Sequence, residues 1–555
     1  MPGLDAPFTR PLRRLAAAHA VFAAEGRVPS RDPAEMLGWY EAQVRHEWED
    51  ARREAEGSPA ARPTRRRFLT GGLGVAASAL LPGLSALPAT AGPPLRDVEP
   101  VVIVGAGLAG LTCAYRLTRH GIPVRVYEAQ ERLGGRCWTI RDQFAHGATG
   151  EHGGQWIDSR HHHIRSLATE LGLDLIDTFA QEPPSAGPEF YWLDGAARSP
   201  SDVFAGYDDF VRAIRAEYRR TGRYFYDQAG PQARAFDQRT SKEWIDANVA
   251  NPLLAQALAL FETGFFGIEA AEQSAINLFE SQVIPYPGAD ERFRVLGGND
   301  RLISAMAAAL PPGSIAAGRE LVAAGRAGDG RVRLTLTGES ADVVASRVVL
   351  ALPFTTLREV DYAGLGLPER RTRAVQTLAM GTNAKFYLQF DRPYAESGFG
   401  SFFVTDDPSS WYAFDTEKDQ DVPDHDAPLL LVYSGGQTGA GYPTSTSEGP
   451  APQTSVTETL AALDRGSTGN PPLSAGYNGK NYLVTWVNNP WVRGSYAGFG
   501  PGQYTDFWGY LETPEPGLFF AGEHTSTHSQ GYLNGGVESG ERAANQVLRG
   551  FGSRA

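Results

Sequence analysis

The sequence predicts an α/β protein in which a Rossmann-like dinucleotide-binding domain is interleaved with an α+β substrate-binding domain. Three observations predict this fold class. A strand, a glycine-rich loop, a helix and a second strand follow one another over residues 101–128. A short apolar strand precedes a glycine-rich turn and a helix at 518–550, and alternating apolar and polar residues at 318–353 read as an antiparallel meander. Because the first two units stand at opposite ends of the chain, we expect one domain built from separated segments.

Composition excludes several classes of protein. The chain has 555 residues, 42% of them hydrophobic, and a formal net charge of −13. A chain of this length is expected to fold around more than one core. Nucleic-acid binders carry a basic face, so this acidic balance predicts no nucleic-acid partner. The two cysteines, Cys113 and Cys137, lack the spacing of zinc ligands, and we predict no metal site.

The first hundred residues read as a leader. The stretch "TRRRFLTGGLGVAASALLPGLSALPATAGPP" within 64–97 has a basic start, a weakly apolar middle and small residues at 89–91. It resembles a bacterial twin-arginine export signal, which predicts a periplasmic or extracellular protein. A flexible linker between two domains is the alternative. The stretch is too short and too rich in Gly and Pro for a membrane span, so no stable membrane insertion is expected. Residues 1–63 read as a helical leader, and translation from Met36 would shorten it.

The glycine loop predicts a nucleotide site. "VVIV" at 101–104 reads as a buried parallel strand, and Gly105, Gly107 and Gly110 follow it as G-x-G-x-x-G. The first glycine permits the tight turn, the second lets the backbone approach a pyrophosphate, and the third lets the helix pack close to the strand. A helix is expected over 108–120, with its N-terminus directed at the phosphates. The next strand ends in Glu128, which is placed to accept hydrogen bonds from ribose hydroxyls.

The residues after Glu128 distinguish FAD from NAD. "ERLGGRCW" at 131–138 brings Arg132, Gly135 and Arg136 directly after the acid. Two basic residues and a Gly pair beside the pyrophosphate are typical of FAD sites. Together with "GGQWID" at 153–158 and the C-terminal "GLFFAGEHTSTHSQGYLNGGVESGERAANQVLRG", these motifs resemble the flavin amine oxidase family, which includes monoamine, polyamine and L-amino-acid oxidases. The resemblance covers about 98–550 and is thin between 180 and 290.

The resemblance implies a non-covalently held FAD and a discontinuous FAD-binding domain of the glutathione-reductase type. That domain is expected at 98–160, 290–353 and 514–550, and the substrate-binding domain at 161–289 and 354–513. Glu523 resembles the family's acid near the ribityl chain, and Val322 the residue whose backbone contacts the adenine. The cofactor-binding residues implied are Gly105, Gly107, Ala109, Gly110, Glu128, Arg132, Gly135, Arg136, Gly153, Gly154, Gln155, Trp156, Val322, Gly522, Glu523, Tyr532 and Leu533.

The resemblance also implies which residues face the reacting part of the flavin. Lys385, within the apolar strand "AKFYLQF", stands where the family has a lysine that holds a water against the flavin and assists reoxidation or imine hydrolysis. Trp486 corresponds to a tryptophan beside the flavin. Tyr496 and Tyr532 correspond to two aromatic rings that bracket the amine nitrogen, where electron-rich faces attract a cation. Ser495 replaces the cysteine of covalent members.

These features predict an enzyme that oxidatively deaminates a primary or secondary amine to an imine or aldehyde and reduces O2 to H2O2. An L-amino-acid oxidase is the alternative; such enzymes commonly carry an arginine after the Gly-Gly of this loop, where Gln155 stands here. Arg160 or Arg493 could still hold a substrate carboxylate. Glu272 and Glu280 are either contacts for the distal nitrogen of a diamine or solvated side chains. A non-catalytic flavin-binding protein is the second alternative, and the oligomeric state is left open, with a homodimer among the options.

Three consecutive histidines, His161–His163, invite a metal interpretation. Neighbouring side chains on a helix point about 100° apart, so three in a row cannot all face one ion. We interpret "SRHHHIRSLATELG" at 159–172 as a helix start, with Ser159 as the N-cap and Gly172 as the stop.

Overall fold

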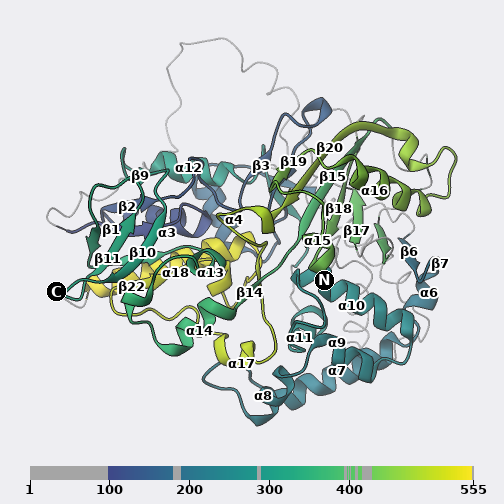
Figure 1. Cartoon of the computed structure of the whole chain (residues 1–555), viewed down its shortest axis with the longest axis horizontal. Coiled ribbons are helices and arrows are strands. Elements are labelled where there is room, and N and C mark those ends of the chain that lie inside the picture. Colours follow the sequence, from purple (N-terminus) through teal and green to yellow (C-terminus); the bar gives the residue numbers. More distant parts are fainter. Residues whose placement is uncertain are drawn as a thin grey trace, which may run out of the picture.

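The computed structural model describes residues 98–178, 189–283, 289–392 and 428–552, with 397, 399, 402–406 and 411–415 between them. The predicted leader and export-signal-like segment, 1–97, lie outside the described residues. In the described part of the chain, no helix combines the length and apolar character needed to cross a membrane. Two sheet-based halves lie side by side (Figure 1).

A five-stranded parallel sheet forms the first half, in the order β22-β13-β1-β2-β9. Its strands are β1 (Val101–Val104), β2 (Val124–Tyr127), β9 (Ile315–Ala316), β13 (Val348–Leu350) and β22 (Leu518–Phe520). They come from all three stretches predicted for the FAD-binding domain. The α/β fold class with a Rossmann-like unit is therefore confirmed.

Both faces of this sheet are covered, which explains why strands β1, β13 and β22 are apolar throughout. Val101 and Ile103 face a cluster that includes α3 (Leu108–Arg119), α12 (Arg301–Ala309) and α18 (Leu533–Gly552). Val102 and Val104 face the opposite side, where the predicted meander packs. That meander is an antiparallel sheet of β10 (Leu321–Arg326), β11 (Val332–Leu336) and β12 (Val343–Ala345).

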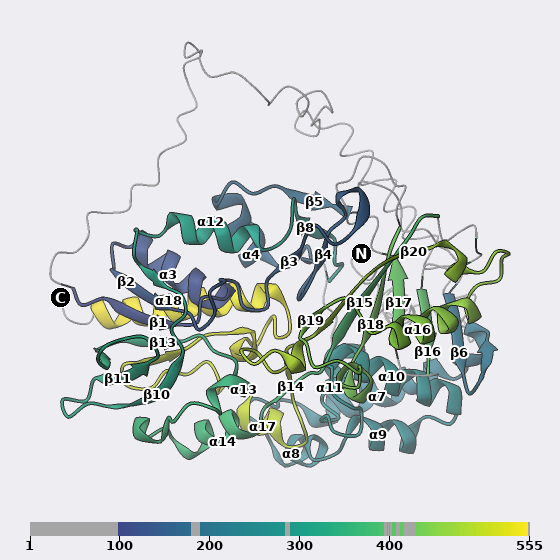
Figure 2. The same cartoon turned by 45° about the horizontal axis from the view of Figure 1, so that its top comes forward.

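The first and last helices of the described chain are neighbours. Figure 2 shows α3 and α18 side by side beneath α12. Glycines permit this approach: a Cβ on Gly540 of α18 would lie 2.4 Å from the carbonyl oxygen of Ala109 in α3. The sequence predicted α3 at 108–120, and the structure places it at 108–119. Both helices begin at the same edge of the parallel sheet, where the nucleotide site was predicted.

The second half is an eight-stranded mixed sheet with helices against it, in the order β19-β20-β15-β18-β17-β16-β6-β7. Its central strand β15 (Ala384–Phe390) is buried at every residue and lies between β18 (Leu429–Ser434) and β20 (Tyr477–Thr485). The other strands are β6 (Glu189–Leu193), β7 (Ala196–Arg198), β16 (Phe402–Thr405), β17 (Trp411–Asp415) and β19 (Glu448–Gly449). The helices of this half include α7 (Tyr207–Thr221), α8 (Pro231–Asp237), α9 (Ser241–Asn248), α10 (Pro252–Phe266), α11 (Asn277–Gln282) and α16 (Gln453–Arg465).

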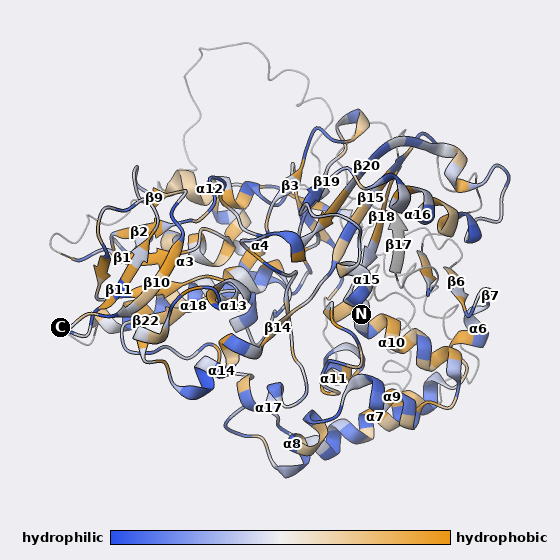
Figure 3. Ribbon diagram, viewed as in Figure 1, coloured by the Kyte–Doolittle hydropathy of each residue, from blue (hydrophilic) through white to orange (hydrophobic). Residues whose placement is uncertain are grey.

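Hydropathy follows this arrangement (Figure 3). Apolar residues concentrate on the central strands of both sheets, whereas the outer helix α7 alternates apolar and polar residues along its length. The buried residues of α7 include Tyr207, Phe210, Val211 and Ile214, spaced three or four apart, so one stripe of the helix faces the core.

Short elements join the halves beside the site. They are β3 (Thr139–Ile140), β4 (Gly150–Glu151), α4 (His162–Glu170), β5 (Leu175–Asp177), β8 (Phe293–Val295), α13 (Phe354–Leu357) and α14 (Glu369–Thr377). The predicted N-cap of α4 is wrong: His161, not Ser159, occupies that position. The Ser159 amide instead donates to Asp290 at 2.6 Å, and a turn through Asp158–His161 precedes the helix.

Candidate active site

A cavity of about 420 Å³ lies where the two halves meet, and its wall includes residues from both. It runs from Glu128 and Val322 at the edge of the parallel sheet to Lys385, Tyr433 and Tyr496 in the second half. Both α3 and α18 begin at its wall. The volume is in the range of pockets that enclose small-molecule ligands.

The nucleotide end of the cavity is built from backbone. Gly105 has φ +101°, and a Cβ there would lie 2.6 Å from the Ala351 carbonyl oxygen, so only glycine fits the turn. Gly107 is the N-cap of α3, and its position carries no side chain to occupy the first amides of the helix. Those amides and the positive end of the helix dipole suit a phosphate. Glu128 accepts the Ala106 and Gln130 amides at 2.8 and 3.0 Å, and burial raises its pKa.

Glu523, which follows β22, joins three parts of the site. Its carboxylate accepts Arg136 Nη1 at 2.9 Å, the Gly531 amide at 2.8 Å and the Ala497 amide at 3.2 Å. Arg136 Nη1 also donates to the Ser495 carbonyl at 2.6 Å. This ion pair ties the first βαβ unit to the C-terminal turn, and both side chains line the cavity.

Most of the predicted cofactor-binding residues line this cavity. They are Gly105, Gly107, Ala109, Glu128, Gly135, Arg136, Gly153, Gly154, Gln155, Trp156, Val322, Gly522, Glu523, Tyr532 and Leu533. Gly110 and Arg132 are not among the lining residues. A Cβ on Gly110 would lie 1.9 Å from the Gly105 carbonyl oxygen, so this glycine serves helix–strand packing. Arg132 lies over the Trp138 ring at 4.0 Å and donates to the Gly135 carbonyl at 2.9 Å, so it braces the loop beside the cavity.

Lys385 lies at the other end of the cavity and is 4% exposed. Its ammonium donates to the carbonyl oxygens of Glu151 and Gly153, both at 3.0 Å, and to Gln155 Oε1 at 2.9 Å. These contacts hold a buried cation against the loop that carries the predicted cofactor-binding residues Gly153, Gly154 and Gln155. Trp486 Nε1 donates to the His152 carbonyl of the same loop at 3.0 Å.

The two tyrosines predicted to bracket the amine nitrogen, Tyr496 and Tyr532, both line the cavity, and Tyr433 lines it beside them. The Tyr496 hydroxyl donates to the Phe265 carbonyl at 2.6 Å and lies 3.0 Å from the Tyr433 hydroxyl. Burial raises the pKa values of Tyr496 and Tyr433 well above the ordinary value, so both phenols stay neutral. The Tyr532 ring packs on His161, with centroids 4.9 Å apart. Tyr433, at the end of β18, carries no motif that sequence analysis could have recognised.

Ser495 stands at the cavity wall where the resemblance expects a covalent cysteine. Its hydroxyl donates to Asn383 Oδ1 at 2.6 Å, and Asn383 Nδ2 donates to the Gly264 carbonyl at 2.8 Å. Cys113 and Cys137 are both free and buried. Burial raises the pKa of each thiol, which disfavours the nucleophilic thiolate.

Both acidic and basic side chains line the substrate end of the cavity. The cavity wall includes Glu280, Glu291 and Arg160. Glu280 accepts the Tyr224 hydroxyl at 2.5 Å, whereas Arg160 Nε donates to Asp158 at 3.2 Å. Arg493 also lines the cavity but pairs with Glu359 at 2.9 Å and is exposed.

Glu272 is exposed and absent from the lining residues, so of its two expected roles the geometry fits the solvated side chain and not the contact with a diamine nitrogen.

The three histidines separate as helix geometry requires. His161 is buried behind Tyr532, and burial lowers its pKa to about 4. His163 pairs with Glu541 of α18 at 2.6 Å, and His162 is exposed. Within the described ranges, no cluster of potential ligands could hold a metal ion. His524 lines the cavity, and burial lowers its pKa to about 3.

The donor set of the cavity fits FAD. Glycine backbone and two helix N-termini suit a pyrophosphate, Glu128 suits ribose hydroxyls, and His524 Nδ1 is buried without a hydrogen-bond partner among the described residues. The predicted adenine contact, Val322, lies at the same end as Glu128. The aromatic end with Trp486 and the tyrosines suits a flat ring system. The residues would therefore hold the adenylate between β1 and β10 and the flavin beside residues 152–156.

Comparison with known proteins agrees with this fit. The family model described as flavin-containing amine oxidoreductase matches residues 108–548. The chain is 24% identical to the flavin-containing amine oxidase A of Sus scrofa, over 81% of this chain and 85% of that protein. It is 26% identical to the L-amino-acid oxidase of Mus musculus, over 82% of this chain and 71% of that protein. Among solved structures, cyclohexylamine oxidase from Brevibacterium oxydans IH-35A matches with a TM-score of 0.69 and 21% identity, covering 81% of this chain and 99% of that one.

Proposed function

The chain belongs to the family of flavin-containing amine oxidoreductases, and from that premise we propose that it oxidises a primary or secondary amine to an imine, with oxygen as the electron acceptor. The imine hydrolyses to an aldehyde or ketone, and oxygen becomes hydrogen peroxide. The observation that carries this proposal is the continuity of the cavity. The same cavity contains the dinucleotide contacts around Gly105 and Glu128 and the reaction-side residues Lys385 and Tyr496.

The protein contributes alignment and exclusion of water. When bound, FAD accepts the hydrogen and the two electrons that leave the α carbon of the amine. The rings of Tyr496 and Tyr532 orient the amine nitrogen, and the neutral Tyr433–Tyr496 hydroxyl pair fixes one of these rings. Trp486 donates a hydrogen bond to the His152 carbonyl and forms part of the cavity wall with these two tyrosines. Lys385 donates to two carbonyls of the loop 151–155 and is proposed to assist the reaction with oxygen.

Charge at the substrate end favours an amine over an α-amino acid. Two carboxylates, Glu280 and Glu291, line the cavity there, and the two guanidiniums that reach it, Arg160 and Arg493, are already paired with Asp158 and Glu359. A carboxylate substrate needs an arginine free to bind it in a bidentate manner. An L-amino-acid oxidase remains the second candidate because Arg160 does reach the wall and because the mouse relative of that name matches most of the chain.

We propose that FAD is held without a covalent bond. Ser495 has no sulfur with which to form a thioether to the flavin, and its hydroxyl donates a hydrogen bond to Asn383. Denaturation in acid should release a yellow supernatant whose flavin migrates with authentic FAD. Flavin that stays with the precipitated protein would contradict non-covalent binding.

The deciding experiment mixes the purified holoenzyme, without oxygen, with a panel of primary amines, secondary amines, diamines and L-amino acids. We expect bleaching of the flavin absorbance with at least one amine and, in air, one peroxide per turnover. Bleaching by amino acids alone would assign the second candidate. A flavin that no member bleaches, although dithionite does, would identify a non-catalytic flavin-binding protein.

Export by the twin-arginine route is a separate proposal that rests on residues 64–94 alone. Fractionation of a bacterial host should place the protein outside the cytoplasm, and Arg65→Lys combined with Arg66→Lys should retain it inside. Export of the double variant at an undiminished level would contradict that route.

A further inference from the structure

The cavity-lining segment Glu151–Gln155 is held by its backbone carbonyls in an unusual way. All five consecutive carbonyl oxygens accept hydrogen bonds from side chains. Lys385 donates to Glu151 and Gly153, Trp486 to His152, and Asn299 to Gly154 and Gln155. Tyr387 adds a second bond to the Glu151 carbonyl at 3.0 Å. Each of these side chains lies more than 140 residues from the segment in sequence.

Asn299 holds the C-terminal end of the segment. It is fully buried, and its Nδ2 donates to the carbonyls of Gly154 and Gln155 at 3.0 and 2.9 Å. Its Oδ1 accepts the Val295 amide at 3.0 Å, which fixes the orientation of the side-chain amide. Both donors of the amide are therefore committed to the two carbonyls that follow the Lys385 contact at Gly153.

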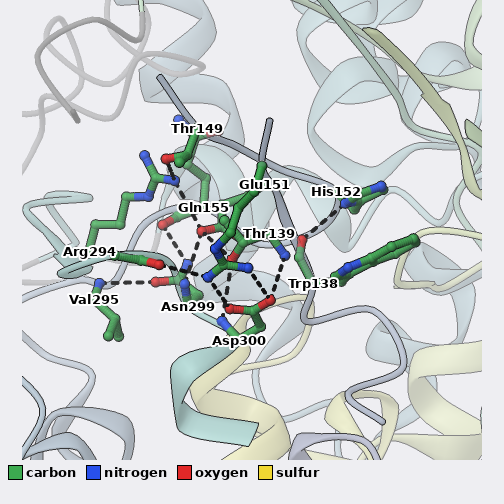
Figure 4. A network of polar contacts seen from close by, with 12 residues as sticks. Trp138, Thr139, Thr149, Glu151, His152, Gln155, Arg294, Val295, Asn299 and Asp300 are labelled. Carbon is green, nitrogen blue, oxygen red and sulfur yellow. Dashed lines mark hydrogen bonds and ion pairs between the residues drawn. The ribbon is translucent and has the colours of Figure 1, made fainter. Parts of the chain in front are cut away.

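A buried ion pair fixes Asn299 in turn (Figure 4). The Glu151 carboxylate accepts the Asn299 backbone amide at 3.0 Å, Arg294 Nη2 at 3.1 Å and the Thr139 hydroxyl. Arg294 Nη2 also donates to Thr149 at 3.0 Å. Glu151 and Arg294 are 0 and 1% exposed. Burial raises the pKa of Glu151, and the charges of Arg294 and Lys385 oppose that rise.

We propose that Asn299, fixed by the buried Glu151–Arg294 pair, is a positioning residue for segment 151–155 and, through it, for the ammonium of Lys385. Lys385 and Asn299 contact the segment from two different elements, β15 and the turn before α12. The segment cannot shift without breaking bonds to both. This inference rests on the proposed function only for its kinetic readout, because the position of the segment can be measured without substrate.

The test variant is Asn299→Asp, which keeps the shape and the acceptor for the Val295 amide but turns an oxygen toward the Gly154 and Gln155 carbonyls. The matched control is Asn251→Asp. Asn251 uses the same pattern: Nδ2 donates to the Asp202 and Ala205 carbonyls, and Oδ1 accepts the Leu253 amide. It caps the far end of α10 and does not line the cavity.

Hydrogen–deuterium exchange on the holoenzyme measures directly how well the backbone amides of the segment are protected. We expect the peptide covering 150–157 to exchange faster in Asn299→Asp and at the wild-type rate in Asn251→Asp. Rapid mixing of reduced enzyme with oxygen measures the rate of the oxygen reaction, in which Lys385 is proposed to take part. Because small misplacements of a reacting group are costly, we expect this reaction to slow about tenfold in Asn299→Asp, with the amine KM within about twofold.

A double-variant cycle separates positioning from simple destabilisation. If Asn299 acts through Lys385, adding Asn299→Asp to Lys385→Met should slow the oxygen reaction by less than a further factor of about two. Independent, multiplicative effects would overturn the proposal, as would unchanged exchange at 150–157. Equal losses in Asn251→Asp would also overturn it. If Asn299→Asp does not accumulate with flavin, Asn299→Ser, which removes both donors without adding charge, takes its place with the same outcomes.

The proposed function can fail separately. Were the wild-type enzyme never bleached by any amine, the exchange experiment would still decide whether Asn299 orders the segment, with dithionite used to prepare reduced enzyme for the oxygen reaction.

Discussion

At the scale of single residues, the site buries the charged side chain of Lys385 against backbone carbonyl groups. The ammonium of Lys385 is solvated by two backbone carbonyls and one side-chain amide oxygen. Burying a cation costs free energy unless its donors are satisfied. Such an arrangement is retained where the charge is needed, which supports a chemical role for the lysine beyond packing.

Replacing Lys385 by Met tests that role. The change removes the charge and the three hydrogen bonds but fills a similar volume. We expect the flavin to remain bound, since Lys385 lies away from Glu128, Gly107 and Glu523. The reaction of the reduced enzyme with oxygen should slow by about 10- to 100-fold, a loss of about 1.4 to 2.7 kcal/mol of transition-state stabilisation. Stopped-flow absorbance measures this rate, and reoxidation at the wild-type rate would remove Lys385 from the oxygen reaction.

His161 should make stability depend on pH. Its folded pKa is lowered to about 4, below the unfolded value of 6.5, because burial disfavours the charged ring. Below pH 6.5 the unfolded chain therefore binds a proton that the folded protein does not, and folding stability falls as pH falls. Relative to His161→Asn, the wild type should lose about 3 kcal/mol between pH 7 and pH 4.

Urea unfolding of holoenzyme at both pH values measures the difference between these two proteins. His162→Asn, at the exposed neighbour, is the control for a general effect of histidine in this turn. A difference between wild type and His161→Asn that stays constant with pH would show that the ring is not buried in its neutral form.

At the scale of elements, close backbone packing at the glycine loop sets the geometry of the nucleotide end. Gly110 in α3 touches the Gly105 turn, and Gly540 in α18 touches α3. The sequence predicted this use of Gly110 from the G-x-G-x-x-G spacing alone, because the loop dictates that helix and strand be close. It could not predict Gly540, because nothing local tells α18 which helix it will meet.

Gly110→Ala should destabilise the first βαβ unit. The added Cβ would lie 1.9 Å from the Gly105 carbonyl oxygen and 3.3 Å from the Ala351 side chain, so α3 must move away from β1. We expect a loss of about 1–3 kcal/mol of stability and a weaker hold on FAD. Thermal unfolding and flavin content measure the two effects. Gly328→Ala, where nothing lies within 4 Å of the added carbon, is the matched control and should behave as wild type.

At the scale of the whole molecule, the predictable part of the site is the part carried by contiguous motifs. Gly105–Glu128, the 153–156 loop and Glu523 stand in recognisable stretches, and they line one cavity. Tyr433, Asn383 and Asn299 were missed because their partners lie 63 to 145 residues away, and no local pattern marks them. Hydrophobic periodicity predicts which elements form, whereas the choice of partner for a buried polar group is decided only by tertiary packing.

Removal of FAD should therefore loosen the molecule as a whole. The nucleotide end is assembled from residues near 105–136, 319–322 and 522–536, and the Arg136–Glu523 pair is one of the contacts that join the first and last of these. A ligand that bridges all three stabilises the folded state by a free energy that grows with the logarithm of its excess over Kd, about 4 kcal/mol at a thousandfold excess. We expect the apoprotein to melt at least about 5 °C below the holoenzyme, and added FAD to restore the difference.

Flavin mononucleotide makes this last prediction specific, because it carries the flavin but lacks the adenylate that Glu128 and Val322 are expected to contact. It should restore less than half of the lost melting temperature. Glu128→Gln should lower the gain from FAD while leaving the gain from flavin mononucleotide unchanged, since the substitution lies at the adenylate end of the cavity. Equal restoration by the two flavins would mean that the glycine loop and its acid do not bind the second nucleotide, and the cavity would then hold the cofactor by its flavin end alone.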